Sequence, residues 1–559
     1  MTSEKRQWLG NLKLGISWGV LAAALGVLTC TEAGYFLGDG STIKHAVALA
    51  WIVISAGFLA TVALRSMGIL LEGEFWRDRD RVWYCIALAL PFGLVYFDVA
   101  GITWTPINDE GAQQVTQGLD LLRHDADFGV YKTAYFVGYI ARQYLLTSLP
   151  SYFFGPSLVA LRIGNSFIYL VGYVAFLSAL AHFFRARGAR NPLILASFAG
   201  VLVSLGEYPI IIARTFEQTT MPMGAMLLFL AGVLHFLNEP TPFRIFWVAW
   251  AFGFFAEGYT PGLGGWCLAL VILLYLSLHP DFKHRILLLP TAYGICCMVV
   301  ACMVLGGGRL HDRLQMGASG LVPSDWAWRY FMGYHTFMGG GTSVIPYPLA
   351  LASITVLYFS FRFRDLKFPL MCLWCIGIAM TGITFVGSNF NLPQFDIHRS
   401  IMVLPALAAG VVLFYHAFSS RLEPAHGAHR AMTFLAGLSM AYMIWTSLAV
   451  PLANRTYVYQ RDMTDYDEAL YKIDCVNYDS GPGTVKKVYL VAPLRIDDLE
   501  TGLGYFAPGA VVVRSAPPPG EKEAGAYTLS YLAPNTSDPI KNPIIPSKSP
   551  RPYLVLKPE

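Results

Sequence analysis

The chain has 559 residues, of which 55% are hydrophobic and only 14% are charged, and its formal net charge is +4. Soluble domains carry roughly 25% charged residues, so this composition excludes an ordinary soluble protein. The small positive charge is spread over many loops and gives no indication of nucleic-acid binding. Runs of about 20 apolar residues recur along the chain, and they lack the period-two alternation of barrel strands. The sequence therefore predicts an all-α polytopic membrane protein.

We predict about thirteen membrane-spanning helices, each roughly as long as a bilayer is thick. The predicted spans are 12–38, 44–65, 82–101, 157–184, 191–212, 217–237, 243–259, 261–279, 285–305, 346–361, 367–387, 398–418 and 430–451. Short loops with Pro or Gly in the region 217–260 leave re-entrant or broken helices as an alternative there.

Basic residues alternate between the two predicted sides of the membrane. The basic amino terminus lacks a cleavable signal pattern and is expected to be cytoplasmic. The basic segments 77–81, 185–190, 283–285 and 362–367 then all fall on the same side. This agreement with the positive-inside rule predicts a multi-pass protein with a cytoplasmic N-terminus. Because the number of spans is odd, the C-terminal segment is expected on the outer side.

Three of the predicted outer segments are longer than turns, namely 102–156, 306–345 and the segment from 453 to the end. In the last of these, the runs 485–491, 510–514 and 527–532 are typical of short strands, and 465–474 of a helix. We therefore expect a small α/β extracytoplasmic domain at 453–559.

An acidic pair, Asp109 and Glu110, follows the third predicted span in the sequence T-P-I-N-D-E-G. Asn108 is a good N-cap, and Leu119 belongs to an apolar stripe beyond it, so a surface helix is predicted to begin here. Acids in a first turn complement the helix dipole by about 0.3–1 kcal/mol each, which is the ordinary structural explanation. At the lipid–water boundary the same carboxylates are also candidates for chemistry.

The motifs around this pair have a recognisable order. An aromatic-rich stretch contains Lys132, Arg162 opens the next span, and F-D-I-H-R-S-I-M-V-L-P places His398 and Arg399 at the outer end of a late span. Over residues 82–420 this order resembles the GT-C superfamily of integral-membrane glycosyltransferases, above all the branch of aminoarabinose transferases and protein O-mannosyltransferases. Relatives usually have one span before the acidic segment. Residues 1–65 are therefore expected to be an added helical pair on a GT-C-like transmembrane catalytic domain at 66–452.

The resemblance implies an inverting enzyme of the bacterial inner membrane that transfers a sugar from a polyprenyl-phosphate donor to an acceptor on the periplasmic face. Asp109 is expected to be the general base and Glu110 to position it or to hold a metal ion. Four further residues are expected to bind the donor phosphate. They are Lys132, Arg214, His398 and Arg399. Distant relatives use a divalent metal, although no ligand cluster in the sequence demands one.

Other polar and aromatic residues near span ends and in the outer segments are expected to line the substrate pocket. They are Arg162, Glu207, Glu217, Glu257, Tyr259, Trp326 and Tyr334. The structural alternatives are an ion pair between Arg214 and Glu217, a snorkelling Lys132, and an interfacial belt of aromatic side chains. The sugar and the acceptor, whether lipid A, a polysaccharide, a protein or another glycan, are left open.

Two other classes of membrane protein compete with the transferase. A flippase or exporter of lipid-linked sugars is expected to have inverted repeats and ionisable residues near mid-membrane, whereas the charges here gather at span ends. A polymerase or ligase of the O-antigen type is expected to have arginine-rich outer loops with a large late loop. Such proteins lack an early acidic segment followed by surface helices.

Overall fold

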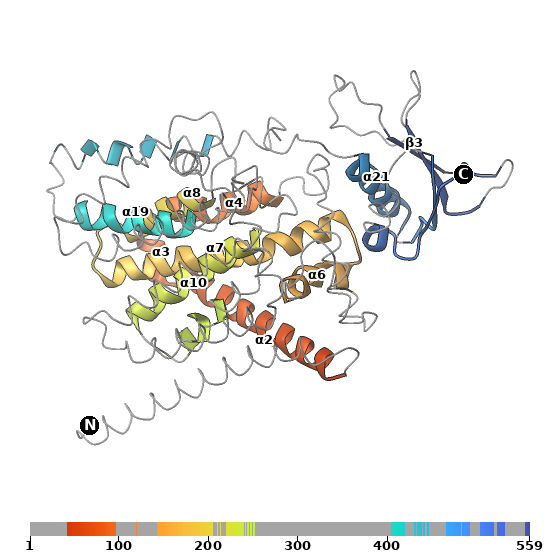
Figure 1. The fold of residues 1–559 in the computed structure, drawn as a ribbon. Coiled ribbons are helices and arrows are strands. Elements are labelled where there is room, and N and C mark those ends of the chain that lie inside the picture. Colours follow the sequence, from red (N-terminus) through yellow and green to blue (C-terminus); the bar gives the residue numbers. More distant parts are fainter. Residues whose placement is uncertain are drawn as a thin grey trace, which may run out of the picture.

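The computed structural model describes residues 42–96, 119, 142–204, 210, 213, 220–239, 404–419, 465–491 without 482, 503–531 without 519–522, and 554–558, together with single residues within 241–251 and 427–445. In this part of the chain, apolar helices form a bundle and a small sheet lies at one end of it (Figure 1).

The main helices of the bundle coincide with predicted spans. They are α2 (Thr42–Met67), α4 (Arg81–Tyr96), α7 (Leu158–Ala186), α8 (Pro192–Ser204), α10 (Thr220–Asn238) and α19 (Leu404–Ser419). Helices predicted at 44–65, 82–101, 157–184, 191–212, 217–237 and 398–418 are thus confirmed in their described parts. Among the described residues, the helical stretches Ile52–Leu71 and Val159–Ala186 are long and apolar enough to cross a membrane. The total of about thirteen spans stays a prediction.

Helix α7 is central, because α2, α8, α10 and the short helix α6 (Arg142–Phe154) all pack against it. The crossing with α10 is close. A Cβ atom on Gly172 would lie 2.5 Å from the carbonyl oxygen of Gly224, and one on Gly224 would lie 2.7 Å from the backbone nitrogen of Tyr169. Small residues that allow such close contact are typical of helix pairs in lipid, where tight packing replaces the hydrophobic effect between helices.

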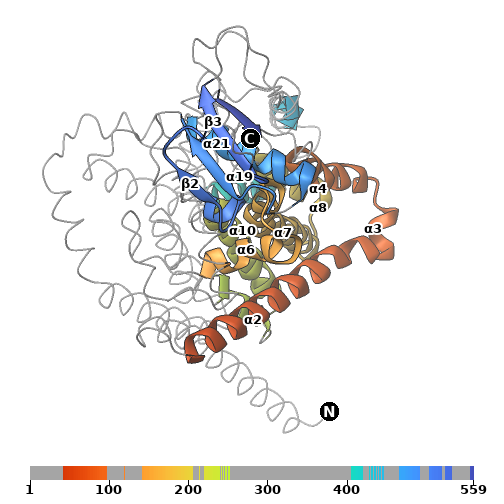
Figure 2. The same ribbon diagram turned by 90° about the vertical axis from the view of Figure 1, so that its right-hand side faces the viewer.

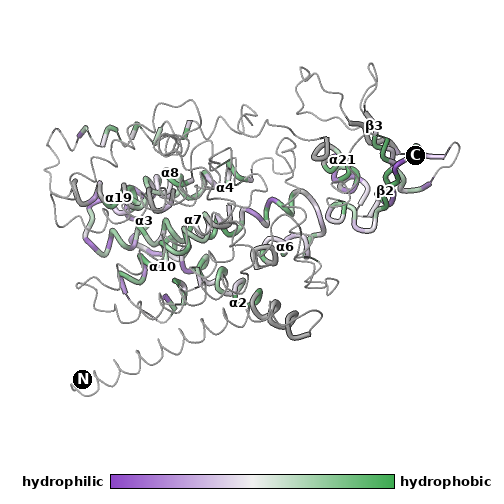
Figure 3. Tube along the Cα trace, viewed as in Figure 1, coloured by the Kyte–Doolittle hydropathy of each residue, from purple (hydrophilic) through white to green (hydrophobic). Residues whose placement is uncertain are grey.

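Two described segments that are predicted to lie on the inner side, one around Glu72 and one around Arg185, meet at one end of the bundle. Helix α2 continues through η1 (Gly68–Leu71) and α3 (Gly73–Arg77). Between these two, Glu72 forms an ion pair with Arg185, and Arg187 donates a hydrogen bond of 2.8 Å to Oδ1 of Asn238. The polar residues at these helix ends lie on the side of the bundle away from the sheet (Figure 3). The alternation of the segments between the two sides of the membrane and the orientation of the chain stay predictions.

The C-terminal unit consists of α21 (Asp465–Ser480) and a sheet of four strands in the order β2-β1-β3-β4. Strand β1 (Lys487–Leu490) is parallel to β2 (Val511–Val513) and β3 (Ala526–Tyr531), and β3 is antiparallel to β4 (Leu554–Pro558). The predicted helix and three predicted strands are confirmed. Strand β4 was not predicted, although residues 553–556 form a short apolar run that is typical of a strand, and its pairing with β3 identifies it. Its Pro558 lies on an edge strand, where proline is tolerated.

The C-terminal unit is bonded to Ser151 of α6 and to Ser157, which precedes α7, so it lies at the end of the bundle where α7 begins (Figure 2, viewed from that end). The domain boundaries 1–65, 66–452 and 453–559 stay predictions.

Candidate functional site

Of the residues predicted to form the site, Arg162 lies within the described part of the chain. The other predicted site residues lie outside it. These are Asp109, Glu110, Lys132, Glu207, Arg214, Glu217, Glu257, Tyr259, Trp326, Tyr334, His398 and Arg399. Within the described residues, no three His, Cys, Asp or Glu side chains are grouped as metal ligands.

Arg162 lies in the second turn of α7. The helix is capped by Ser157, whose hydroxyl oxygen accepts a hydrogen bond of 3.1 Å from the backbone N–H of Ala160. The arginine is 2% exposed and thus enclosed by protein. Because taking a guanidinium out of water is costly, such residues in apolar helices need polar partners and often mark substrate paths.

Polar side chains from three helices surround this turn of α7. Asn165 donates a hydrogen bond of 3.2 Å to the Thr220 hydroxyl at the start of α10. The Ser166 hydroxyl lies 2.9 Å from the carbonyl oxygen of Arg162 and 3.0 Å from the hydroxyl of Tyr96, which ends α4. Asn165 and Ser166 are three and four residues beyond Arg162 and therefore share its helix face. We call these five residues the α7 polar cluster.

Leu119 connects the acidic segment with the same end of α7. It is helical and 2% exposed, as the predicted apolar stripe requires. It belongs to one apolar core with Leu161 of α7 and with the C-terminal unit, including Leu470 and Ile473 of α21. Leu161 immediately precedes Arg162. One residue of the segment that carries the acidic pair therefore belongs to the apolar core that also contains Leu161, the sequence neighbour of Arg162.

Tyr505 fixes the C-terminal unit at this place. Its hydroxyl donates a hydrogen bond of 2.8 Å to the carbonyl oxygen of Ser157 and lies 2.7 Å from the Ser151 hydroxyl of α6. The backbone N–H of Ser157 also points to it, at 3.3 Å. Burial raises the pKa of Tyr505, which keeps the hydroxyl protonated and able to donate.

Most of the residues around Arg162 and Tyr505 were not predicted from the sequence. Asn165 and Ser166 were detectable in principle, because polar residues at three and four positions beyond an arginine share its face in an otherwise apolar helix. No sequence signal links Tyr505 with Ser157, because the two residues are 348 positions apart.

Comparisons with known proteins give little further guidance. No protein-family model matches the chain, and a search of curated proteins finds no match. Among solved structures, the crystal structure of ArnT from Cupriavidus metallidurans bound to undecaprenyl phosphate is similar to it. The likeness covers 78% of this chain and 86% of that chain, with 12% sequence identity and a TM-score of 0.40.

Proposed function

We propose that the chain is an inverting membrane glycosyltransferase. It moves a sugar from a polyprenyl-phosphate donor to an acceptor on the outer face of the bacterial inner membrane. The order of motifs along the sequence supports this proposal. The structural observation that carries it is that Leu119 belongs to the same apolar core as Leu161, the residue before the buried Arg162.

The place of Leu119 in this core supports our proposal for where the acidic pair lies. Asp109 and Glu110 precede Leu119 by ten and nine residues. In a helix, which rises 1.5 Å per residue, they would stand about 14–15 Å from Leu119 along the axis. The proposed site therefore lies at the end of the bundle where α7 begins and where the C-terminal unit docks.

The proposed chemistry is a direct displacement at the anomeric carbon. The acceptor oxygen forms a bond to that carbon while the bond from the carbon to the phosphate oxygen breaks, and the configuration inverts. Asp109 takes the proton of the acceptor hydroxyl. Phosphate is already a good leaving group and needs no strong acid, so the second requirement is cations that stabilise its charge.

The remaining residues have supporting roles in this proposal. Consecutive helical side chains point about 100° apart, so Glu110 orients the acceptor or Asp109 while Asp109 acts as the base. Lys132, Arg214, His398 and Arg399 hold the phosphate, where guanidinium groups add bidentate geometry. Arg162 lines the substrate pocket with Glu207, Glu217, Glu257, Tyr259, Trp326 and Tyr334.

An assay in detergent separates this proposal from the flippase alternative. Purified protein is mixed with polyprenyl-phosphate-linked sugars extracted from bacterial membranes, together with lipid and glycan acceptors, and the lipids are followed by mass spectrometry. A transferase converts the donor to free polyprenyl phosphate and a glycosylated product. A flippase has no second membrane face in detergent and leaves every donor unchanged, and that result would contradict the proposal.

A further inference from the structure

A second polar region lies at the end of the bundle away from the C-terminal unit. The helices α2, α7 and α10 end there, and a cavity of about 410 Å³ opens between them. Six of its lining residues have basic or aromatic side chains. They are Arg65, His182, His235, Phe243, Arg244 and Trp247.

The cations of this cavity are held in place by neighbouring groups. Nη1 of Arg244 lies 3.2 Å from the carboxylate of Glu239 and also donates to the Glu239 carbonyl oxygen. The Arg65 guanidinium lies 4.2 Å from the centre of the Phe243 ring, in a cation–π contact. A guanidinium that is already fixed loses less rotational freedom when it binds an anion.

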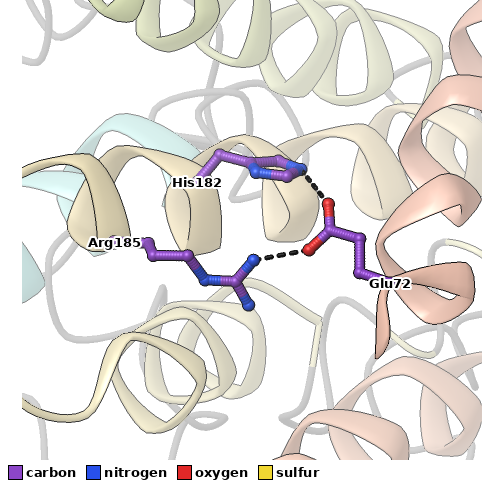
Figure 4. Close-up of polar contacts among 3 residues, drawn as sticks. All are labelled: Glu72, His182 and Arg185. Carbon is purple, nitrogen blue, oxygen red and sulfur yellow. Dashed lines mark hydrogen bonds and ion pairs between the residues drawn. The ribbon is translucent and has the colours of Figure 1, made fainter. Parts of the chain in front are cut away.

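The α7 wall of the cavity is fixed by Glu72 (Figure 4). One carboxylate oxygen of Glu72 lies 3.8 Å from Nε2 of His182, and the other lies 2.5 Å from Nη1 of Arg185. The ring of His182 lies 5.9 Å from that of His235, so two imidazoles are neighbours in the cavity wall. Each imidazole supplies at least one N–H donor in any charge state.

Positive charge predominates at this end of the bundle. Among the described residues in and directly around the cavity, four arginines oppose two glutamates. The arginines are Arg65, Arg185, Arg187 and Arg244, and the glutamates are Glu72 and Glu239. With neutral histidines, the cluster is therefore suited to an anion, because an added negative charge reduces the repulsion among the arginines.

We propose that this cavity binds a phosphate group on the side of the membrane predicted to be cytoplasmic. Guanidinium groups bind phosphate with paired, charge-assisted hydrogen bonds, and the imidazoles add further donors. The site lies at the opposite end of α7 from Arg162, so it is separate from the proposed transfer site and does not rest on the transferase proposal.

Two sources of such a phosphate fit the cavity, an anionic phospholipid headgroup and a soluble phosphate compound. Basic pockets between spanning helices on the cytoplasmic side typically bind anionic headgroups. Apolar side chains next in sequence to polar residues of this region are exposed: Leu64, which precedes Arg65, is 75% exposed, and Leu71, which precedes Glu72, is 87% exposed. These side chains offer a surface for acyl chains, which favours the lipid.

Native mass spectrometry of the purified full chain, titrated with phosphatidylglycerol or with zwitterionic phosphatidylcholine, tests the proposal. The wild type is expected to bind phosphatidylglycerol more tightly. The double variant Arg65→Gln with Arg244→Gln is expected to weaken that binding by roughly tenfold or more, because charge-assisted hydrogen bonds are lost. Arg77→Gln with Arg79→Gln is the matched control, since it removes two exposed charges from the same end of the bundle outside the cavity.

A second variant, Ala186→Glu, is used because loss of Arg244 also breaks its pair with Glu239. Ala186 is exposed and lines the cavity, so the new carboxylate repels a phosphate without removing an existing side-chain contact. Inorganic pyrophosphate serves as a competitor. If pyrophosphate binds to the wild type and this binding is lost in both cavity variants, the source of the phosphate is a soluble compound. If pyrophosphate does not displace bound phosphatidylglycerol, the source is the lipid. Unchanged binding in the folded cavity variants, or equal weakening by the control, would overturn the proposal.

Discussion

The hydroxyl of Tyr505, in the C-terminal unit, donates a hydrogen bond of 2.8 Å to the carbonyl oxygen of Ser157, the residue that caps α7. Together with the apolar core shared with Leu161, this bond joins the C-terminal unit to the first turns of the central helix. Arg162 and the α7 polar cluster lie in those turns. The position of the C-terminal unit is therefore coupled to the geometry of the proposed site.

We predict that Tyr505→Phe loosens this docking. The substitution removes the partner of the Ser151 hydroxyl and of the Ser157 backbone N–H, at a cost of about 1–3 kcal/mol, while the Ser157 carbonyl oxygen keeps its hydrogen bond from the Leu161 N–H. Limited proteolysis of the purified protein should then release the C-terminal unit faster than in the wild type. Tyr527→Phe removes a hydroxyl from the sheet of the same unit and serves as the control. Equal cleavage rates for the two variants would contradict the assigned role of Tyr505.

A second prediction concerns the crossing of α7 and α10. In Gly224→Ala, the new methyl group would lie 2.7 Å from the backbone of Tyr169, so the two helices must separate. We expect a loss of about 1–3 kcal/mol in the free energy of unfolding, measured as a lower melting temperature in detergent. In Gly57→Ala, a Cβ on helix α2 meets nothing within 4 Å, and this control should be neutral or slightly stabilising. If Gly57→Ala lowers the melting temperature more than Gly224→Ala does, α7 and α10 do not cross as described.

The third prediction is that Arg162 is required in the proposed reaction as a guanidinium and not only as a positive charge. Arg162→Lys keeps the charge but loses the planar fork of donors, so transfer should fall by about tenfold or more. Arg190→Lys changes an exposed residue at the other end of the bundle and should leave transfer unchanged. Both variants are first compared by thermal unfolding. Full transfer by a well-folded Arg162→Lys would remove this residue from the proposed site.

The fourth prediction tests the packing of the acidic segment. Leu119→Ala removes buried methyl groups from the core shared with Leu161, and substitutions of this kind cost about 2–5 kcal/mol. Hydrogen exchange should therefore accelerate in the first turns of α7 and in α21. Leu435→Ala, at a position that is exposed, is the matched control. Unchanged exchange in both regions would argue against the role given to Leu119.

The sequence was informative where local physics decides the structure. Apolar length alone predicts α2 and α7, and β-branched runs predict β1, β2 and β3, because membrane thickness and strand pairing act on consecutive residues. Burial of Leu119 was predictable from its place in a helical stripe. Pattern reasoning failed where distant segments meet, as in the pairing of β4 with β3 and the bond from Tyr505 to Ser157.

The cavity that we propose to bind phosphate also could not be predicted from local sequence patterns. Arg65, His182, His235 and Arg244 come from separate segments, and each alone is typical of the end of a membrane span. Their convergence follows from the packing of α2 and α10 against α7, which no local pattern contains. The two histidines within apolar helices were the available signal, because titratable residues are rare there.

In the proposed reaction, Asp109 is the base of a sugar transfer from polyprenyl phosphate. Its most direct test is the rate of transfer by purified Asp109→Asn, compared with wild type and with Asp479→Asn, which alters an exposed carboxylate of α21. Asparagine keeps the size of the side chain but cannot accept the proton. We predict that Asp109→Asn loses transfer by about a hundredfold or more with an unchanged melting temperature, while Asp479→Asn retains it. Transfer at the wild-type rate by Asp109→Asn would contradict the mechanism.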